Sequence, residues 1–330
     1  LKIMTTYKEI FGKYVRSVSS DPPTAAGEGE IWYNTSSNTF KTVVQVGAWA
    51  SGGSLGNSRG GGASAGTQTA GLYAGGNAPG YVNDTEEYGG TSWTAGGTLG
   101  TTRGYVAGMG TQTSALAAGG FPGPSNGATE EYNGSSWTGG GSLGTGRYGL
   151  ASAGTQTAGL AFGGTSDGAQ NSTEEYDGSN WTEQNALNTA RRYLAGAGTQ
   201  TAGLAIGGTT GPGNAVTTAT EEYNGSSWTS NPTGLNSGRG NLGGCGTQTA
   251  ALVFGGLLTA PAPGTGIALT EEYNGSTWAV ASTLATARYF IGGTGTSTVA
   301  LAMGGRQSPG ALGNTEEYVP AAAVKTLTTS

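Results

Sequence analysis

Histidine is absent from this chain, and a single cysteine, Cys245, stands among its 330 residues. Without histidine a Ser–His–Asp triad cannot form, and zinc, copper and non-haem iron sites lack their usual ligands. Aspartate is also scarce, and its four residues are scattered along the chain, which argues against a calcium loop. We therefore expect neither a metal nor a cofactor.

Charge and long apolar runs are scarce too. Charged residues make up 10% of the chain, and the formal net charge is −6. A general nucleic-acid binder needs a basic face, so we expect no nucleic-acid partner. No stretch approaches the roughly 18 apolar residues of a membrane-spanning helix, and the first residues lack the apolar core of a signal peptide. We expect no membrane insertion and no ordinary secretory route.

What the chain has in abundance is glycine, with 66 residues at recurring positions in tandem repeats. A Trp is followed by an Arg, a Gly-Thr-Gln-Thr turn or close variant, a Gly-Gly pair and Thr-Glu-Glu-Tyr. The tryptophans are Trp49, Trp93, Trp137, Trp181, Trp228 and Trp278. The arginines are Arg59, Arg103, Arg147, Arg191, Arg239 and Arg288. The tyrosines are Tyr88, Tyr132, Tyr176, Tyr223, Tyr273 and Tyr318.

Each repeat reads as four short strands. The small residues after the Arg, as in 147–154, suit a crowded innermost strand, and Cys245 replaces an Ala there, so we expect a buried thiol. Leu160 and Phe162 alternate onto one face that would pack on the next unit. Thr-Glu-Glu-Tyr and the following Trp strand are joined by Asn-Gly, Asp-Gly or Gly-Gly, which predicts a hairpin with two residues at positive φ.

Such a unit cannot bury its own apolar faces, so the units must pack around an axis. The last Thr-Glu-Glu-Tyr, 315–318, has no following Trp, and Trp49 has no preceding Thr-Glu-Glu-Tyr. We expect the two chain ends to share one sheet, which gives six blades. Because 41–44 stands where Thr-Glu-Glu-Tyr stands elsewhere, seven blades is the alternative.

The order of double Gly, Tyr, Trp and Arg over residues 49–318 resembles the kelch motif, and TEEYNGSSW with GTQTAGLAFGG resembles repeat proteins of marine tailed bacteriophages. The segment 29–35, Gly-Glu-Ile-Trp-Tyr-Asn-Thr, resembles a hairpin near the N-terminus of phage tail-fibre proteins. These resemblances imply an all-β, kelch-like β-propeller on a virion, assembled in the host cytoplasm and then released. The implied organisation is a docking and linker segment with a hairpin at 1–46, a propeller at 47–319 and a tail at 320–330.

The repeat arginines and the paired glutamates have two interpretations. One Glu of each pair forms an ion pair with the repeat Arg, or the six arginines form a ring that binds an anion such as an acidic sugar or a phosphate. Sixfold repetition argues against catalysis, which needs one asymmetric site. We therefore expect a protein that is not an enzyme.

The repeats differ in length almost wholly in the connection between Gly-Gly and Thr-Glu-Glu-Tyr. In an up-and-down blade these connections share a face with the Trp-to-Arg loops, and loops on a rigid scaffold carry recognition. The longest connection, 257–269, offers Leu257, Leu258 and Ile267 as exposed candidates for contacting a partner, with neutral drift as the alternative.

Three functions remain open from the sequence. The first is a virion appendage or decoration protein that recognises a host-surface glycan or protein. The second is a purely structural subunit that docks other virion proteins through its N-terminal segment, and a homo-oligomer is compatible with both. The third, a secreted bacterial lectin or carbohydrate-active enzyme, fits less well because histidine and a signal peptide are missing.

Overall fold

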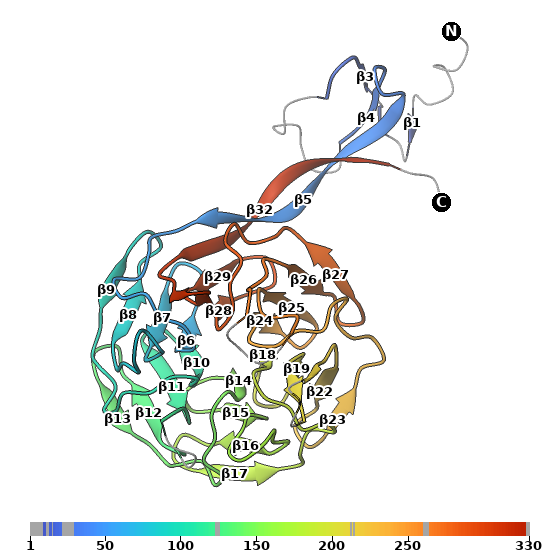
Figure 1. The fold of residues 1–330 in the computed structure, drawn as a ribbon. Helices are drawn as coiled ribbons and strands as arrows, with labels where there is room; N and C mark the ends of the chain where they lie inside the picture. The colour runs from blue at the N-terminus through green and yellow to red at the C-terminus, as the bar shows by residue number, and fades with distance from the viewer. Residues whose placement is uncertain are drawn as a thin grey trace. The chain divides into compact units, whose positions relative to one another are not determined.

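A computed structural model describes residues 9–10, 13–14, 16–21, 30–122, 126–211, 213, 215–259 and 264–327. Within these ranges all regular structure is β (Figure 1), and no helix is long and apolar enough to cross a membrane. The chain divides into two compact units. The larger unit is Trp49–Val319, and the smaller one combines Leu1–Ala48 with Pro320–Ser330.

Five antiparallel sheets of four strands, here called blades 1 to 5 in chain order, make up most of the larger unit (Figure 1). In each blade the chain runs from the innermost strand outwards. The strands are β6 Ala63–Gly66, β7 Gly71–Ala74, β8 Thr85–Tyr88 and β9 Trp93–Ala95; β10 Ala107–Thr111, β11 Ser114–Ala118, β12 Thr129–Tyr132 and β13 Trp137–Gly139; β14 Ala151–Gly154, β15 Gly159–Phe162, β16 Thr173–Tyr176 and β17 Trp181–Gln184; β18 Ala195–Gly198, β19 Gly203–Ile206, β22 Thr220–Tyr223 and β23 Trp228–Ser230; β24 Gly243–Thr247, β25 Ala250–Phe254, β26 Thr270–Tyr273 and β27 Trp278–Ala281.

A sixth sheet, here called the closing sheet, takes strands from both ends of the chain in the order β28-β29-β32-β5-β4-β3. Its strands are β28 Gly292–Gly295, β29 Ala300–Met303, β32 Thr315–Thr326, β5 Thr39–Ser51, β4 Ile31–Asn34 and β3 Arg16–Val18. The ring of Trp49 on β5 lies 5.0 Å from that of Tyr318 on β32 and 4.9 Å from that of Phe254 in blade 5. The prediction that the chain ends share a sheet at Trp49 is confirmed.

The expected number of blades needs correction. The structure has five four-stranded blades, whereas the closing sheet has six strands because β3 and β4 extend it beyond β5. The seven-bladed alternative is wrong, since 41–44 lies within β5 and begins no sheet of its own. The innermost strands β6, β10, β14, β18, β24 and β28 contact one another in sequence around the axis, and β28 contacts β6.

The crowding of these inner strands explains their composition. A Cβ atom built on Gly108 of β10 would lie 2.3 Å from the backbone nitrogen of Ser64 on β6, which is too close for any side chain. Small residues on the innermost strands are therefore confirmed and have a steric cause. Cys245 on β24 is buried as expected, and burial raises the pKa of its thiol to about 12.

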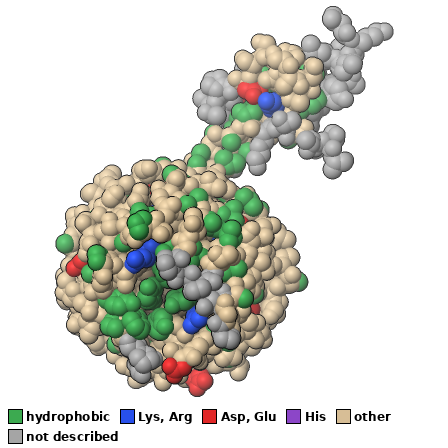
Figure 2. Space-filling view, in the orientation of Figure 1, with side chains coloured by type: hydrophobic (Ala, Val, Ile, Leu, Met, Phe, Trp, Pro, Cys, Tyr) green, Lys and Arg blue, Asp and Glu red, His purple; other side chains and the backbone are tan. Residues whose placement is uncertain are grey.

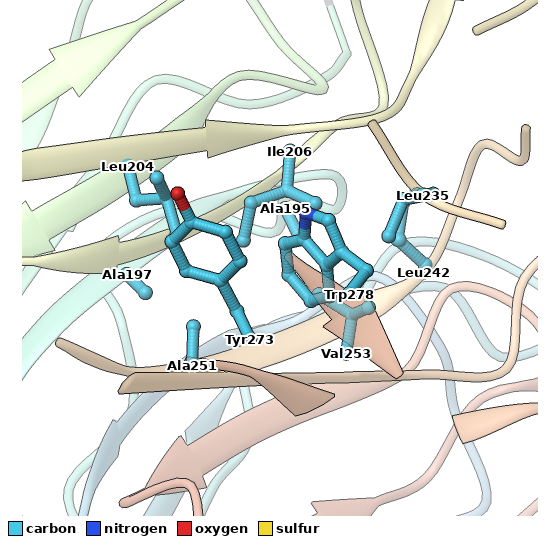
Figure 3. Packing of buried hydrophobic residues seen from close by; sticks show 10 residues of the cluster. All are labelled: Ala195, Ala197, Leu204, Ile206, Leu235, Leu242, Ala251, Val253, Tyr273 and Trp278. Carbon is cyan, nitrogen blue, oxygen red and sulfur yellow. The ribbon is translucent and has the colours of Figure 1, made fainter. Parts of the chain in front are cut away.

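Neighbouring sheets pack through the alternating apolar residues of their second strands. Figure 3 shows Leu204 and Ile206 of β19 against Val253, Tyr273 and Trp278 of blade 5. Every one of these side chains is at least nine-tenths buried. The prediction that these positions join one unit to the next is confirmed, because neither sheet covers this surface alone.

The outer hairpins differ from the prediction. The loop from Tyr132 to Trp137 has four residues, and of its Asn-Gly pair only Gly134 has positive φ, at 91°. The Asn133 side chain accepts hydrogen bonds from the backbone N–H groups of Ser135 and Ser136, at 3.0 and 2.9 Å. Asn is therefore present as a side-chain cap of the turn and not as a left-handed residue.

In the smaller unit β4 and β5 form an antiparallel hairpin, and β3 pairs with β4 in parallel. Asp21 accepts hydrogen bonds from Asn34 at 2.5 Å, Lys41 at 2.9 Å and Trp32 at 3.2 Å. Within the predicted docking and linker segment 1–46, residues 1–8, 11–12, 15 and 22–29 lie outside the described residues. The described residues also form three short hairpins, β1 Glu9–Ile10 with β2 Lys13–Tyr14, β20 Thr209–Thr210 with β21 Ala215–Val216, and β30 Arg306–Gln307 with β31 Gly310–Ala311.

Candidate functional site

The six repeat arginines are fully buried inside the sheets. Each guanidinium group forms an ion pair with the first Glu of Thr-Glu-Glu-Tyr in its own sheet, at 2.9 Å for Arg103 with Glu130. The pairs are Arg59–Glu86, Arg103–Glu130, Arg147–Glu174, Arg191–Glu221, Arg239–Glu271 and Arg288–Glu316. The ion-pair interpretation of the arginines is confirmed.

The alternative, a ring of arginines that binds an anion, does not fit this geometry. All six side chains are 0% exposed, and none lines either cavity described below. Burial lowers the pKa of Arg191 to about 10, which still leaves it charged at neutral pH. The second oxygen of each Glu holds the preceding loop, as where Glu130 accepts from the backbone N–H of Gly100 at 2.7 Å. The arginines therefore fix the blade and its loops.

The repeat Tyr and Trp residues join each sheet to the one before it. Tyr132 donates its hydroxyl hydrogen to Glu87 of blade 1 at 2.5 Å, and Trp137 donates its indole N–H to Thr85 at 2.9 Å. Both bonds recur at all six junctions, including those of the closing sheet. These twelve side chains and the second Glu of each pair therefore hold the ring together.

The two faces of the ring differ in character. On one face lie the Gly-Thr-Gln-Thr turns and the outer hairpin loops, which are alike in almost every repeat. The opposite face, here called the variable face, carries the connections from second to third strand and those from one sheet to the next. Antiparallel order places both sets there, as the sequence predicts. Loop diversity on a rigid scaffold makes the variable face the candidate binding face.

A closed ring of backbone hydrogen bonds surrounds the axis on the variable face. The residue two positions before the start of each innermost strand donates its N–H to the matching residue of the preceding repeat, with N···O distances from 2.5 to 2.9 Å. All six have positive φ, between 53° and 70°. They are Gly61, Tyr105, Gly149, Tyr193, Asn241 and Phe290. Four residues other than glycine, Tyr105, Tyr193, Asn241 and Phe290, thus hold a backbone conformation that favours glycine, which costs strain.

Three of these side chains meet over the axis. The ring centroids of Tyr105 and Phe290 lie 4.8 Å apart, and Tyr193 lies 6.0 Å from Tyr105 and 5.6 Å from Phe290. Burial raises the pKa of Tyr105 to about 12, so its hydroxyl remains neutral at physiological pH. We call Tyr105, Tyr193 and Phe290 the aromatic triad.

The triad and the inner strands line an axial cavity of about 150 Å³. Asn241 also lines it, is 5% exposed, and has a side-chain oxygen with no hydrogen-bond partner. Ser64 and Ser152 line it as well, and their hydroxyls donate to backbone carbonyls of neighbouring repeats at 3.1 and 2.8 Å. The cavity is polar enough to hold ordered water.

Further aromatic rings extend outwards from the triad. Tyr148 lies 6.2 Å from Tyr105 and 5.2 Å from Phe121, and Phe121 lies 5.2 Å from Tyr81. All four are half-buried, so part of each ring reaches solvent. Figure 2 shows hydrophobic side chains gathered within the ring on the face turned to the viewer. This half-buried aromatic cluster makes the variable face a candidate interaction surface.

Beside Tyr148 an open hollow of about 480 Å³ lies between blades 3 and 4. It is lined by Tyr148, Asp167, Arg192 and the hydroxyl residues Thr165 and Ser166, together with small residues. Its volume falls in the range of about 300–1,000 Å³ that is usual for small-molecule sites. The hollow therefore brings an aromatic ring, a carboxylate, a guanidinium and hydroxyl groups to one place.

Two of the three apolar residues predicted to be exposed in the longest connection, 257–269, are less exposed than expected. Leu257 is 1% exposed, and its backbone exchanges hydrogen bonds with Gly240, so the expectation that its side chain is exposed is wrong. Ile267 is half-buried and bridges to Arg288. Leu258 alone of the three is exposed, at 47%. Residues 260–263 of this connection lie outside the described residues.

Sequence reasoning missed the triad and the hollow. The signal lay in the first two positions after each repeat Arg, which hold Gly60 and Gly61 in one repeat but Arg192 and Tyr193 in another. These positions lie in a part of the repeat whose length never changes, so differences in loop length do not single them out. The informative signal was the replacement of Gly by a large side chain at the same position of different repeats.

No protein-family model matches the chain, and no curated protein matches it. Among solved structures, the chain is similar to YjhT, a propeller-type protein, with a TM-score of 0.66 and 12% sequence identity. The match covers 83% of this chain and 99% of the YjhT chain. The chain is a β-propeller. At this identity the likeness shows the fold alone, so the function must be argued from the site.

Proposed function

We propose that this protein is a non-catalytic recognition module that binds a surface glycan or protein through the variable face of its propeller. The observation that carries the proposal is the contrast between the faces. The repeated turns and hairpins give one face nearly the same chemistry around the ring. The other face gathers the connections of different length and the half-buried aromatic residues.

The state of the repeated carboxylates supports binding over catalysis. The first Glu of each pair is held by an Arg and by a backbone N–H, as Glu130 is. The second Glu accepts a hydrogen bond from the repeat Tyr hydroxyl of the following sheet, as Glu87 does from Tyr132. Both are committed to the ring, and the pattern recurs around it, whereas a catalytic dyad needs two carboxyl groups facing one substrate.

The wider setting rests on the sequence resemblance. The repeats resemble the kelch motif and the repeats of marine tailed bacteriophages. We infer a virion appendage that is assembled in the host cytoplasm and then released. The separate unit at the chain ends supports a role for residues 1–46 in docking other virion proteins. Cross-linking of the intact particle tests this, because cross-links from residues 1–46 to another virion protein are expected.

Binding is tested with an array of bacterial surface polysaccharides and with whole host cells. The informative variant is Tyr105→Gly/Phe290→Gly, because Gly61 and Gly149 occupy the same left-handed position in sister repeats. The control is Ser135→Ala/Ser226→Ala on the opposite face. The proposal expects binding by the native protein and the control, and loss of binding in the triad variant. Equal binding by all three proteins would place recognition outside the aromatic triad. Binding to virion proteins alone would establish the purely structural function instead.

A further inference from the structure

The hollow between blades 3 and 4 combines three side chains at positions that differ elsewhere in the ring. Tyr148 and Arg192 each follow a repeat Arg, and Asp167 stands third after a Gly-Gly pair. At the junction of blades 1 and 2 the same three positions are occupied by Gly60, Gly104 and Pro79. The hollow therefore breaks the symmetry of the repeats and gives the face one asymmetric site.

The backbone holds two of these residues firmly in place. Tyr148 exchanges backbone hydrogen bonds with Thr165 at 3.0 and 2.9 Å, and Arg192 exchanges them with Thr209 at 3.0 and 2.8 Å. The guanidinium of Arg192 also donates to the hydroxyl of Thr165 at 3.2 Å and lies 5.8 Å from the ring centroid of Tyr193. Its orientation is therefore set before any ligand arrives, which lowers the entropic cost of binding.

The third residue, Asp167, lies at the exposed tip of a short connection. Gln170 closes this connection by donating to the hydroxyl of Ser166 at 3.1 Å and to the carbonyl of Gly168 at 3.3 Å. Gln170 also donates its backbone N–H to Gly164 at 2.8 Å. The carboxylate of Asp167 is thus carried on a braced loop at the edge of the hollow.

The chemistry of the lining selects a class of ligand. Because Asp167 and Arg192 carry opposite charges, a charged group on the ligand would be attracted by one of them and repelled by the other, so neither sign of ligand charge is favoured by both. A neutral molecule with several hydroxyl groups suits both, because each hydroxyl donates to a carboxylate and accepts from a guanidinium. The half-buried ring of Tyr148 offers an apolar surface beside them.

We propose that this hollow binds one neutral hexopyranose unit of a glycan, with Asp167 accepting from its hydroxyls, Arg192 donating to them and Tyr148 stacking on its C–H face. The inference rests on the proposed recognition function and names the ligand class of that face. It also names residues outside the aromatic triad, so the two proposals are tested by different variants.

The test is ligand-observed NMR with a fixed panel of probes. The neutral probes are the methyl glycosides of glucose, galactose, mannose and N-acetylglucosamine, and the charged probes are glucuronic acid and glucosamine. We expect at least one neutral probe to bind more tightly than both charged probes. Asp167→Asn and Arg192→Gln should each weaken that binding about tenfold or more, because each removes a charge-assisted hydrogen bond. Tyr148→Ala should weaken it as well.

Matched controls separate the hollow from the rest of the surface. Asp177→Asn makes the same charge change on the opposite face, where sister repeats carry Asn133, Asn224 and Asn274. Arg306→Gln removes a guanidinium from the variable face at the junction of the closing sheet and blade 1. Both controls should bind the neutral probe as the native protein does. Folding of each variant is checked by its thermal unfolding midpoint.

The outcomes distinguish this inference from the proposed function. Tighter binding of glucuronic acid or glucosamine would overturn the ligand class. Binding of a neutral probe that survives all three hollow variants would overturn the site. Native protein that binds cells or the array through the triad but binds no neutral probe would overturn this inference alone. Failure of the protein to bind cells, the array and every probe would overturn both proposals.

Discussion

Replacing Glu174 by Gln tests whether the buried ion pair of blade 3 is closed as the structure shows. Arg147 is 0% exposed, the Glu174 side chain is 4% exposed, and one Glu174 oxygen also accepts from the backbone N–H of Gly144 at 2.7 Å. Glu174→Gln leaves a buried guanidinium without its counter-charge. Removing one partner of a buried pair costs about 3–5 kcal/mol. Because Gln keeps a carbonyl acceptor, we expect about 3 kcal/mol.

The assay is urea unfolding followed by tryptophan fluorescence, with the free energy of unfolding obtained by linear extrapolation. The exposed substitution Asp177→Asn serves as control and should change stability by no more than about 0.5 kcal/mol. The double variant Arg147→Met/Glu174→Leu should recover much of the loss, since well-packed apolar pairs replace buried ion pairs at little cost. A loss below about 1 kcal/mol for Glu174→Gln would refute the buried pair.

Four further outcomes follow from the contacts around the ring. Asn241→Gly should raise the unfolding free energy by about 1 kcal/mol, because it relieves a left-handed backbone at φ 58° and removes an unpaired buried oxygen, and a lower thermal midpoint would contradict this. Gln200→Ala should cost about 1–3 kcal/mol in urea unfolding, because the carbonyls of Tyr176 and Gly159 lose donors at 2.7 and 3.2 Å; no loss would show that water replaces the side chain. Trp49→Ala should cost about 3–5 kcal/mol, as much as Trp137→Ala in a contiguous blade, and a markedly smaller loss would mean that the closing sheet adds little. Stability should fall as pH rises from about 10 to 12, since burial and a bond to Glu131 raise the folded pKa of Tyr176 from 10.0 to about 12, and Tyr176→Phe should make that fall shallower in a pH series of unfolding curves.

Much of the ring could be predicted because its determinants are repeated. A residue that recurs at the same place in every repeat indicates a shared structural role. The arginine–glutamate ion pairs and the small residues of the innermost strands could therefore be predicted. The closing sheet could be predicted because Trp49 has no preceding Thr-Glu-Glu-Tyr and the last Thr-Glu-Glu-Tyr, 315–318, has no following Trp. The two ends therefore supply complementary parts of one repeat. The sequence predicted a hairpin around 29–35, which β4 and β5 form, but β3 belongs to no repeat and left no signal, and nothing indicated that this hairpin extends the closing sheet.

Contacts between sheets were harder to foresee than contacts within them. The bond of Tyr132 to Glu87 needs the register of two neighbouring blades, which no single repeat specifies. Gln200 was seen only as a turn residue, yet it reaches carbonyls of the preceding blade. Leu257 was expected on the surface because it lies in a long connection, but its bridge to Gly240 holds it inside.

The binding face escaped prediction for a conformational reason. Tyr105, Tyr193 and Phe290 occupy left-handed positions where sister repeats carry Gly, and sequence patterns for strands do not anticipate bulky residues there. Their meeting over the axis follows from the closed ring of backbone hydrogen bonds, which is a property of the assembled fold. The hollow likewise needs two blades to exist.

Hydrogen–deuterium exchange gives the most direct test of the variable face as the recognition surface. The full chain is compared with and without the array polysaccharide that it binds most tightly. Protection is expected in peptides that cover 104–106, 165–169 and 190–193, with no change at the outer hairpin loops 133–136 and 177–180. Protection of those hairpin loops without protection of the variable face would contradict the account.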